Sequence, residues 1–147
     1  MRERLSDEIK SSAVAWHVEY VSPREIDNVG IGCALRRAFR RAIDEIESSE
    51  VEVKAVLLDG NPLHIDDREV NIVKGDSKCA PIAAASIVAK VERDHLMERY
   101  AADYPQYGFE SNKGYGTDFH REAIRKHGLT DIHRKSFCSE FLQDSLF

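Results

Sequence analysis

The chain has 147 residues, of which 42% are hydrophobic and 32% are charged, and its formal net charge is −5. A chain of this length normally forms one domain with its own hydrophobic core, so we expect residues 1–147 to form a single domain. No apolar run approaches the roughly 20 residues that a membrane-spanning helix requires. The negative charge excludes binding of nucleic acid through bulk electrostatics alone, although local basic patches could still bind it.

The sequence indicates neither secretion nor a disulfide framework. Met1 is followed by charged residues and not by the apolar segment of a signal peptide, so we expect a cytosolic protein. Its three cysteines are Cys33, Cys79 and Cys138. They are widely separated and form no Cys-x-x-Cys pair, which argues against both disulfides and a zinc site.

The first two predicted elements are a helix and a strand. Residues 2–12 are mostly charged, with Leu5 and Ile9 one helical turn apart. Residues 13–21 alternate with the period of a strand. One face of that strand would carry Val14, Trp16, Val18 and Tyr20.

The next segment has the signals of a helix start. Ser22 can cap the helix and Pro23 fits its first position, so a helix is predicted from there to about Glu47. Gly30 and Gly32 fall inside this range, and each weakens a helix by about 1 kcal/mol relative to alanine. A short helix followed by a longer one is therefore the alternative.

Two apolar runs that end near a carboxylate predict buried strands. Residues 51–58 lead into Asp59, and residues 69–73 are followed shortly by Asp76. If the strands are neighbours, these carboxylates converge at the edge where ligands of α/β sheets gather. Such a pair suits Mg²⁺ or Mn²⁺ and metal-assisted phosphodiester hydrolysis. On spacing alone, the favoured alternative is that Asp59 begins a turn and Asp76 caps the following helix.

The remaining segments complete an α/β pattern. Residues 81–103 predict a long helix that opens with small residues, which permit close approach to a sheet. Residues 112–116 read as a glycine-rich loop. Thr117 can cap a helix that runs to His127 and stops at Gly128. The order of strands and helices predicts an α/β sandwich without internal repeats.

A row of arginines could form a basic face on one helix. Arg36, Arg37, Arg40 and Arg41 recur at helical spacing. Such runs are usually solvated helix surface, and that interpretation is favoured over contact with nucleic acid.

Three histidines could be metal ligands, but their spacing argues against a metal site. His120, His127 and His133 lack the compact spacing of metal ligands, and carboxylates suit magnesium better. We interpret His133, together with Arg134, as part of a packing motif near the C-terminus.

Several strings of the sequence, in one order along almost the whole chain, resemble the ribonuclease HII family of bacterial type. They are 25–27 (EID), 58–61 (LDGN), 73–77 (VKGDS), 82–90 (IAAASIVAK) with Arg93 and Asp94, 104–108 (YPQYG), 113–115 (KGY), Thr117, His120, Gly128 and 133–137 (HRKSF). Several motifs in one order are far more specific than any single motif.

The resemblance implies a ribonuclease H-like fold and an active site of four carboxylates that hold two divalent metal ions, Mn²⁺ or Mg²⁺. Asp59 would be the third carboxylate, at the metal site, and Asp76 the fourth, beside the scissile phosphate. The family's other two carboxylates lie in an N-terminal Asp-Glu-x-Gly-Arg-Gly motif, which is absent from this sequence. The chain is thus similar to the C-terminal two thirds of the family fold, without its N-terminal strands.

The family's activity is cleavage of RNA in RNA–DNA hybrids and at single ribonucleotides in duplex DNA. The resemblance implies a cut on the 5′ side that leaves 3′-hydroxyl and 5′-phosphate ends. Water would be the nucleophile, activated by one metal while the other stabilises the leaving oxygen. Tyr115 would stack beside the junction of RNA and DNA, and Lys74 and Lys113 would contact phosphates.

Three alternatives follow from the absent motif, whose Gly-Arg-Gly loop grips the ribonucleotide in the family. The chain could be a non-catalytic remnant that binds nucleic acid, or one half of an enzyme completed by a separate N-terminal segment. It could also be a truncated product of a gene whose natural form includes the motif. Two carboxylates leave little ligand charge for two dications, and an open sheet edge is an aggregation hazard.

Overall fold

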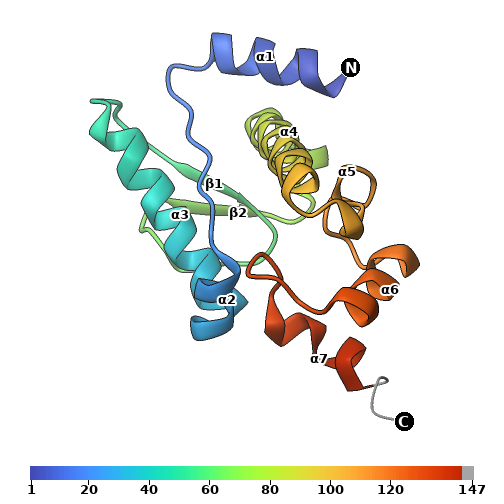
Figure 1. Ribbon diagram of the computed structural model, residues 1–147. Helices are drawn as coiled ribbons and strands as arrows, with labels where there is room; N and C mark the ends of the chain where they lie inside the picture. The colour runs from blue at the N-terminus through green and yellow to red at the C-terminus, as the bar shows by residue number, and fades with distance from the viewer. Residues whose placement is uncertain (144–147) are drawn as a thin grey trace. The chain divides into compact units, whose positions relative to one another are not determined.

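The computed structural model describes residues 1–143, which form helices and one small sheet (Figure 1). The helices are α1 (Arg2–Ser12), α2 (Pro23–Val29), α3 (Ile31–Ser48), α4 (Ala80–Asp103), α5 (Phe109–Asn112), α6 (Asp118–His127) and α7 (Lys135–Gln143). The strands are β1 (Val56–Asp59) and β2 (Glu69–Ile72), and two 3₁₀ turns are η1 (Gly75–Ser77) and η2 (Pro105–Tyr107). None of the described helices is long and apolar enough to cross a membrane.

Backbone contacts divide the chain into two compact units. The first consists of Met1–Tyr20 and Gly32–Glu92, and the second of Val21–Ile31 and the chain from Arg93 onward. Helix α4 contributes its first half to one unit and its second half to the other. The single domain stays a prediction.

The sheet of the first unit consists of two parallel strands. β1 and β2 pair in the register Val56↔Glu69 to Asp59↔Ile72. Both strands were predicted and are confirmed, although β1 is shorter than the predicted range 51–58. Their adjacency, which the sequence analysis stated only as a condition, is met. Since parallel pairing aligns the carboxyl ends of the strands, the residues that follow β1 and β2 lie at one edge.

One face of β1 forms the core of the first unit. Val56 and Leu58 are buried, whereas Leu57 between them is exposed, as the alternation of a strand requires. The buried pair packs against Ile43 and Phe39 of α3. Complete burial of such side chains contributes about 1.5–3 kcal/mol each. Packing on α3 therefore fixes which face of β1 points inward.

Local signals fixed several helix boundaries correctly. The Ser22 side chain accepts a hydrogen bond from the Glu25 amide at 3.1 Å and starts α2. Gly30 has φ 78 and separates α2 from α3, so the alternative of two helices is confirmed. The Thr117 side chain caps α6, which ends before Gly128 as predicted.

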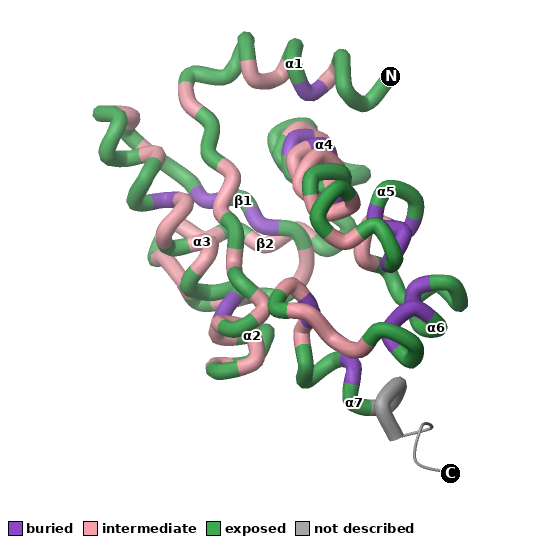
Figure 2. The backbone as a smooth tube through the Cα atoms, viewed as in Figure 1, coloured by how far each residue is buried: buried purple, intermediate pink, exposed green. Residues whose placement is uncertain are grey.

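The prediction of a strand over residues 13–21 is wrong. The backbone is extended there but belongs to no sheet, and the described part of the chain offers it no partner strand. Its apolar side chains are not buried on one face, since Val14 is 90% and Trp16 is 48% exposed. Figure 2 accordingly shows this segment without a buried residue. A strand needs a neighbouring strand to pair its backbone N–H and C=O groups. The alternation of side chains along the sequence does not show whether such a neighbour exists.

The core of the second unit is centred on two stacked aromatic rings. Tyr107 and Phe109 are almost completely buried, with ring centroids 5.6 Å apart. The Tyr107 hydroxyl donates a hydrogen bond to the Gly128 carbonyl at 2.8 Å, just beyond α6. The cluster is completed by Met97, Ala123, Ile124 and Cys138. These contacts hold α5, α6 and α7 around one centre.

Helix α7 begins at a carboxylate from a distant part of the chain. The Asp27 carboxylate of α2 accepts hydrogen bonds from the backbone amides of Lys135 and Ser136, at 2.8 and 3.1 Å. It also accepts one from the Ser136 hydroxyl. These bonds, that of the Ser136 hydroxyl first, lower the pKa of Asp27. Asp27 therefore acts as a cap from outside the helix.

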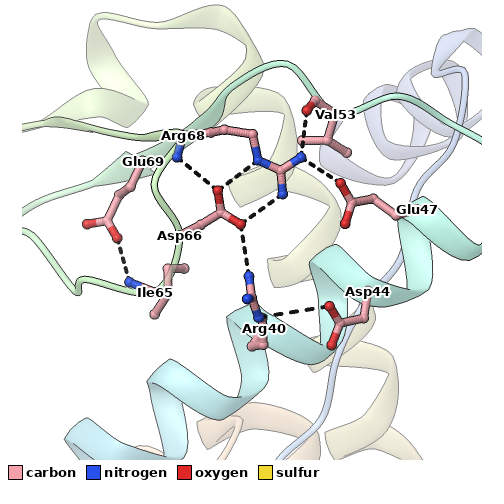
Figure 3. Close-up of polar contacts among 8 residues, drawn as sticks. All are labelled: Arg40, Asp44, Glu47, Val53, Ile65, Asp66, Arg68 and Glu69. Carbon is pink, nitrogen blue, oxygen red and sulfur yellow. Dashed lines mark hydrogen bonds and ion pairs between the residues drawn. The ribbon is translucent and has the colours of Figure 1, made fainter.

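The connection between β1 and β2 is short and is held by the Glu69 carboxylate. Glu69 accepts hydrogen bonds from the amides of Leu63 at 2.7 Å and Ile65 at 2.9 Å (Figure 3 shows the Ile65 bond). These backbone bonds, that of Ile65 first, lower the pKa of Glu69 to about 2. A crossover between parallel strands normally contains a helix, and here side-chain bonds order the loop instead.

Asp66 and Arg68 extend this support to α3. Arg68 donates to both oxygens of Asp66, at 2.7 and 2.8 Å, and to the Val53 carbonyl at 2.7 Å. Arg40 of α3 donates to Asp66 at 2.9 Å, and Glu47 pairs with Arg68 at 2.6 Å (Figure 3). The Asp66 side chain is only 7% exposed. This ionic network ties the crossover loop to α3.

We predict that Asp66→Asn destabilises the protein at neutral pH and has less effect in acid. The hydrogen bonds from Arg68 hold the pKa of Asp66 well below its ordinary value. A carboxyl with a lowered pKa contributes stability above its unfolded value of about 4, and this contribution disappears as the pH falls through the folded value. Urea unfolding followed by circular dichroism at pH 7 and pH 3 measures the change.

The matched control is Asp67→Asn, a substitution of the exposed neighbour. It should leave the free energy of unfolding nearly unchanged at both pH values, since surface substitutions usually have small effects. If both substitutions lowered the free energy of unfolding equally at pH 7, the network of Asp66 and Arg68 would not be important for stability.

Candidate active site

Asp59 is the last residue of β1, and its carboxylate forms a hydrogen bond with a residue outside that strand. Its Oδ1 accepts a hydrogen bond from the Gly75 amide at 2.7 Å. The next residue, Gly60, has φ 93 and donates from its amide to the Ile72 carbonyl at 3.1 Å. The end of β1 is therefore held both to β2 and to the turn that follows β2. The Asp59 residue is otherwise exposed.

Asp76 lies in the turn to which Asp59 is bonded. Lys74 adopts a left-handed conformation, with φ 57, and begins η1. Gly75 is buried, and a Cβ there would lie 2.6 Å from the Ile82 side chain of α4. Asp76 itself is exposed, and among the described residues its carboxylate accepts no hydrogen bond from a backbone amide in the first turn of α4. The structure thus does not support the alternative in which Asp76 caps the long helix.

The two aspartates are brought to one edge of the sheet as the parallel strands require. The Asp59–Gly75 bond holds the end of β1 against the residue that precedes Asp76. Carboxylate oxygens suit a hard divalent cation, but such a cation takes about six ligands or more. The described residues include no group of three or more histidine, cysteine, aspartate or glutamate side chains placed to bind a metal. Asp59 and Asp76 therefore fit only part of a divalent metal site.

Tyr115 lies in a loop of the second unit and presents its side chain to solvent. The residue is 77% exposed. The loop backbone is held by the buried side chain of Asn112, which donates to the Tyr107 carbonyl at 2.6 Å and accepts from the Gly114 amide at 2.8 Å. The Tyr115 amide donates to the Asn112 carbonyl at 2.8 Å. An exposed ring on such a fixed loop is available for stacking, which remains a prediction.

The two predicted phosphate ligands differ in their surroundings. Lys113 has φ 50, and its ammonium group pairs with Glu98 at 2.6 Å. The hydrogen bond from Lys113 lowers the pKa of Glu98. Lys74 is exposed at the left-handed turn before Asp76. Lys74 belongs to the same unit as the aspartates, and Lys113 to the same unit as Tyr115.

The arginine row on α3 is partly neutralised by carboxylates. Arg40 pairs with Asp66 at 2.9 Å, and Arg41 pairs with Glu19 at 2.6 Å. The pKa of Glu19 is lowered first by the hydrogen bond from His17 and also by that from Arg41. These pairs support the interpretation of the row as an ordinary helix surface.

Two groups of polar residues were missed in the sequence. One is the network of Asp66 and Arg68, and the other is a buried contact between His120 and His133, whose Nε2 atoms are 3.1 Å apart. Both histidines sit among aromatic rings. No local pattern of the sequence indicates the histidine contact, because the two residues are 13 positions apart.

We predict that Gly114→Ala destabilises the loop of Tyr115. Gly114 has φ 81, and a Cβ there would lie 3.1 Å from both Arg93 and Met97. A left-handed conformation alone costs a non-glycine residue about 1–2 kcal/mol. Gly116→Ala is the matched control, because its Cβ would meet Arg121 only at ordinary contact distance, 3.5 Å. Urea unfolding should show that Gly114→Ala, but not Gly116→Ala, lowers the free energy of unfolding by about 1–2 kcal/mol. Equal decreases for the two variants would contradict backbone strain at position 114.

Comparisons with known proteins find related sequences along almost the whole chain. The model of the family described as Ribonuclease HII matches residues 1–140. The chain is 45% identical to the ribonuclease HII of Ruminiclostridium cellulolyticum over 143 residues, which are 97% of the chain and 55% of that protein. It is 43% identical to the ribonuclease HII of Caldanaerobacter subterraneus over 97% of the chain and 58% of that protein.

A third relative is covered more completely. The ribonuclease HII of Neisseria meningitidis is 42% identical over 99% of the chain and 76% of that protein. The chain spans little more than half the length of the Ruminiclostridium and Caldanaerobacter relatives. The helices and the parallel strand pair are those of an α/β, ribonuclease H-like fold. The chain belongs to the ribonuclease HII family.

Proposed function

We propose that the chain supplies two catalytic carboxylates and substrate contacts of an endonuclease that cleaves the RNA strand of RNA–DNA hybrids and DNA at single embedded ribonucleotides. The observation that carries this proposal is the placement of Asp59 at the end of β1 and of Asp76 in the turn after the adjacent parallel strand β2, joined by the Asp59–Gly75 bond. Membership of the ribonuclease HII family supports the same reaction class.

In this proposal, Asp59 and Asp76 bind Mn²⁺ or Mg²⁺ together with further oxygen ligands from outside the described residues. The metal would polarise the phosphate and stabilise the charge of the leaving oxygen. The Gly75 amide holds one oxygen of Asp59, so the carboxylate is oriented before any cation arrives. Asp76 stands on a turn fixed by the buried Gly75, which limits how far its carboxylate can move.

The substrate contacts are local, because the net charge of the chain is negative. The exposed ring of Tyr115 suits stacking against a sugar or base at the junction of RNA and DNA. Lys74 beside Asp76 suits a phosphate near the carboxylates. Lys113 would exchange its carboxylate partner Glu98 for a phosphate oxygen. These contacts position the duplex and do not read its sequence.

A second candidate, in which the chain is one half of a two-part enzyme, is favoured by an apolar groove in the first unit. The groove has a volume of about 690 Å³. It is lined by the extended segment at Trp16, by Leu35 and Phe39 of α3, and by Ala85 and Val88 of α4. Trp16 and Leu35 are 48% and 41% exposed, so apolar surface remains uncovered. Exposed apolar surface of this kind marks an interaction site.

The occupant that fits this groove is a polypeptide segment that adds strands to the sheet. Among the described residues, the sheet has two strands only, and a pair this small is marginally stable alone. Residues 14–19 are extended and belong to no strand of the described sheet, so their backbone could pair with a further strand. A companion that carries the Asp-Glu-x-Gly-Arg-Gly motif on such a strand would bring the remaining carboxylates to the edge that bears Asp59.

We expect cleavage of a duplex DNA with one embedded ribonucleotide when the chain is mixed with a companion polypeptide that carries this motif. With Mg²⁺ or Mn²⁺ present, Asp59→Asn and Asp76→Asn should each reduce the rate roughly 100-fold or more, because loss of a ligand removes several kcal/mol of transition-state stabilisation. Gel analysis of 5′-labelled strands reports both the rate and the position of the cut.

Asp67→Asn is the control, and the variant should cleave the duplex at the same rate as the unsubstituted chain. Cleavage by the chain alone, abolished by both active-site substitutions, would mean that the two carboxylates suffice. Hybrid binding without cleavage in every mixture would contradict the enzymatic proposal and identify the chain as a binding remnant.

We also predict that the companion polypeptide binds in the apolar groove. Ala85→Glu places a charge on its apolar lining, and burial of an unpaired charge is strongly unfavourable, so the companion should bind at least about tenfold more weakly. Ala102→Glu, an exposed position of α4 in the second unit, is the matched control. Isothermal titration of the companion measures both affinities. Unchanged binding to the Ala85→Glu variant would exclude this groove as the docking surface.

A further inference from the structure

Two buried histidines of the second unit contact each other through their ring nitrogens. His120 lies in the first turn of α6 and His133 in the turn before α7. They are only 4% and 6% exposed, and their Nε2 atoms are 3.1 Å apart. The rings of Tyr107 and Phe109 enclose them, with the Tyr107 centroid 5.0 Å from that of His133. The pair is therefore shielded from water by the core of this unit.

The outer nitrogen of each ring faces a backbone group whose role is fixed. The Thr130 amide can only donate, so the Nδ1 atom of His133, 3.1 Å away, accepts and the proton of that ring is on Nε2. The Thr130 hydroxyl lies 2.8 Å from the same Nδ1 atom and can also donate to it. The Tyr115 carbonyl can only accept, so the Nδ1 atom of His120, 3.0 Å away, must carry a proton. His120 then has a free lone pair on Nε2, which accepts from His133.

These assignments form one continuous chain of hydrogen bonds with a single direction. It runs from the Thr130 amide through His133 and His120 to the carbonyl of Tyr115. The Tyr115 side chain is exposed, and its backbone carbonyl otherwise accepts only the Thr117 amide among the described residues. We propose that His120 and His133 are positioning residues that hold the Tyr115 loop for contact with the nucleic acid, an inference that rests on the proposed role of Tyr115.

An additional proton would break this chain of bonds. A proton on Nδ1 of His133 would oppose that of the Thr130 amide and could bond only to the Thr130 hydroxyl, 2.8 Å away, and one on Nε2 of His120 would oppose the proton of His133. Burial, and then the charge of His120, lower the pKa of His133 to about 4. The folded state thus favours a neutral His133 ring, so the free energy of unfolding is unaffected above the unfolded pKa of about 6.5 and decreases as the pH falls from there to about 4.

Other ionisable groups face the pair from the elements around it. Tyr107 of η2 contacts His133, and its own pKa is raised by burial. A hollow beside His133 is also lined by charged residues of α2, of the preceding turn and of α7. They are Arg24, Asp27, Asp131 and Lys135. Because acids and bases are balanced in this hollow and the Asp27 carboxylate caps α7, none of them supplies a dedicated counter-ion for a protonated His133.

Nitrogen-15 NMR of the full chain tests the tautomers without any nucleic acid. At about pH 7.5 we expect His120 to carry its proton on Nδ1 and His133 on Nε2, with slow exchange of both protons. The Tyr115 loop amides should lose protection together with these signals as the pH falls from about 6.5 toward 4. Nε2–H on His120, or loop protection that is independent of pH over this range, would overturn the proposal.

Two substitutions of His120 separate positioning from packing. The shorter amide side chain that His120→Asn introduces can still donate to the Tyr115 carbonyl, whereas the longer side chain of His120→Gln reaches toward His133 and leaves that carbonyl without its donor. Hybrid binding, measured by fluorescence anisotropy, should stay within about twofold for His120→Asn and fall roughly tenfold for His120→Gln, in line with the loss of one stacking contact. His127→Gln, at an exposed position of α6, is the control.

Equal effects of His120→Asn and His120→Gln on loop protection would overturn the positioning role. If the unsubstituted chain binds no hybrid at any pH while the tautomers and the protected loop are as expected, the role of Tyr115 in the proposed function fails and the hydrogen-bonded pair stands as a loop anchor only. Unexpected NMR results would therefore overturn the positioning role of the histidines, whereas expected NMR results without hybrid binding would overturn the proposed role of Tyr115.

Discussion

The hydrogen bond from the Gly75 amide to the Asp59 carboxylate is the interaction on which the candidate active site depends. It joins the end of β1 to the turn that follows β2, at a distance of 2.7 Å. Without it, Asp59 and Asp76 would be two exposed acids at the ends of a four-residue strand pair. With it, one carboxylate is oriented and the other stands on a turn whose backbone is anchored. The small sheet is supported in turn by α3 and by the network of Asp66 and Arg68.

The second unit follows the same rule with different groups. An exposed side chain, Tyr115, is carried by a backbone that is fixed from inside by Asn112 and by the histidine pair. Asp76 in the first unit and Tyr115 in the second are both exposed, and the backbone that carries each is fixed by bonds of neighbouring residues. Such a division leaves the functional group accessible while its placement is determined by buried polar groups.

Sequence signals that act over a few residues predicted the structure well. The helix at Arg2–Ser12 and the Thr117 cap of α6 depend on local spacing, and both were found. Asp59 was recognised because it follows an apolar run, and its strand does pair with the next one. The strand predicted at 13–21 failed because pairing needs a neighbour that spacing cannot reveal. The Arg40–Asp66 bond and the histidine pair join residues 26 and 13 positions apart, and no local pattern announces them.

The proposed role of Asp59 and Asp76 as one half of a divalent cation site is tested directly by titration of the ¹⁵N-labelled chain with Mn²⁺. The paramagnetic ion broadens the signals of nearby amides. The amides of Gly60, Gly75 and Ser77 should broaden first, and this early broadening should disappear in Asp59→Asn. Broadening that begins at other acidic segments, such as residues 44–52, or that is unchanged in the variant, would contradict the shared site.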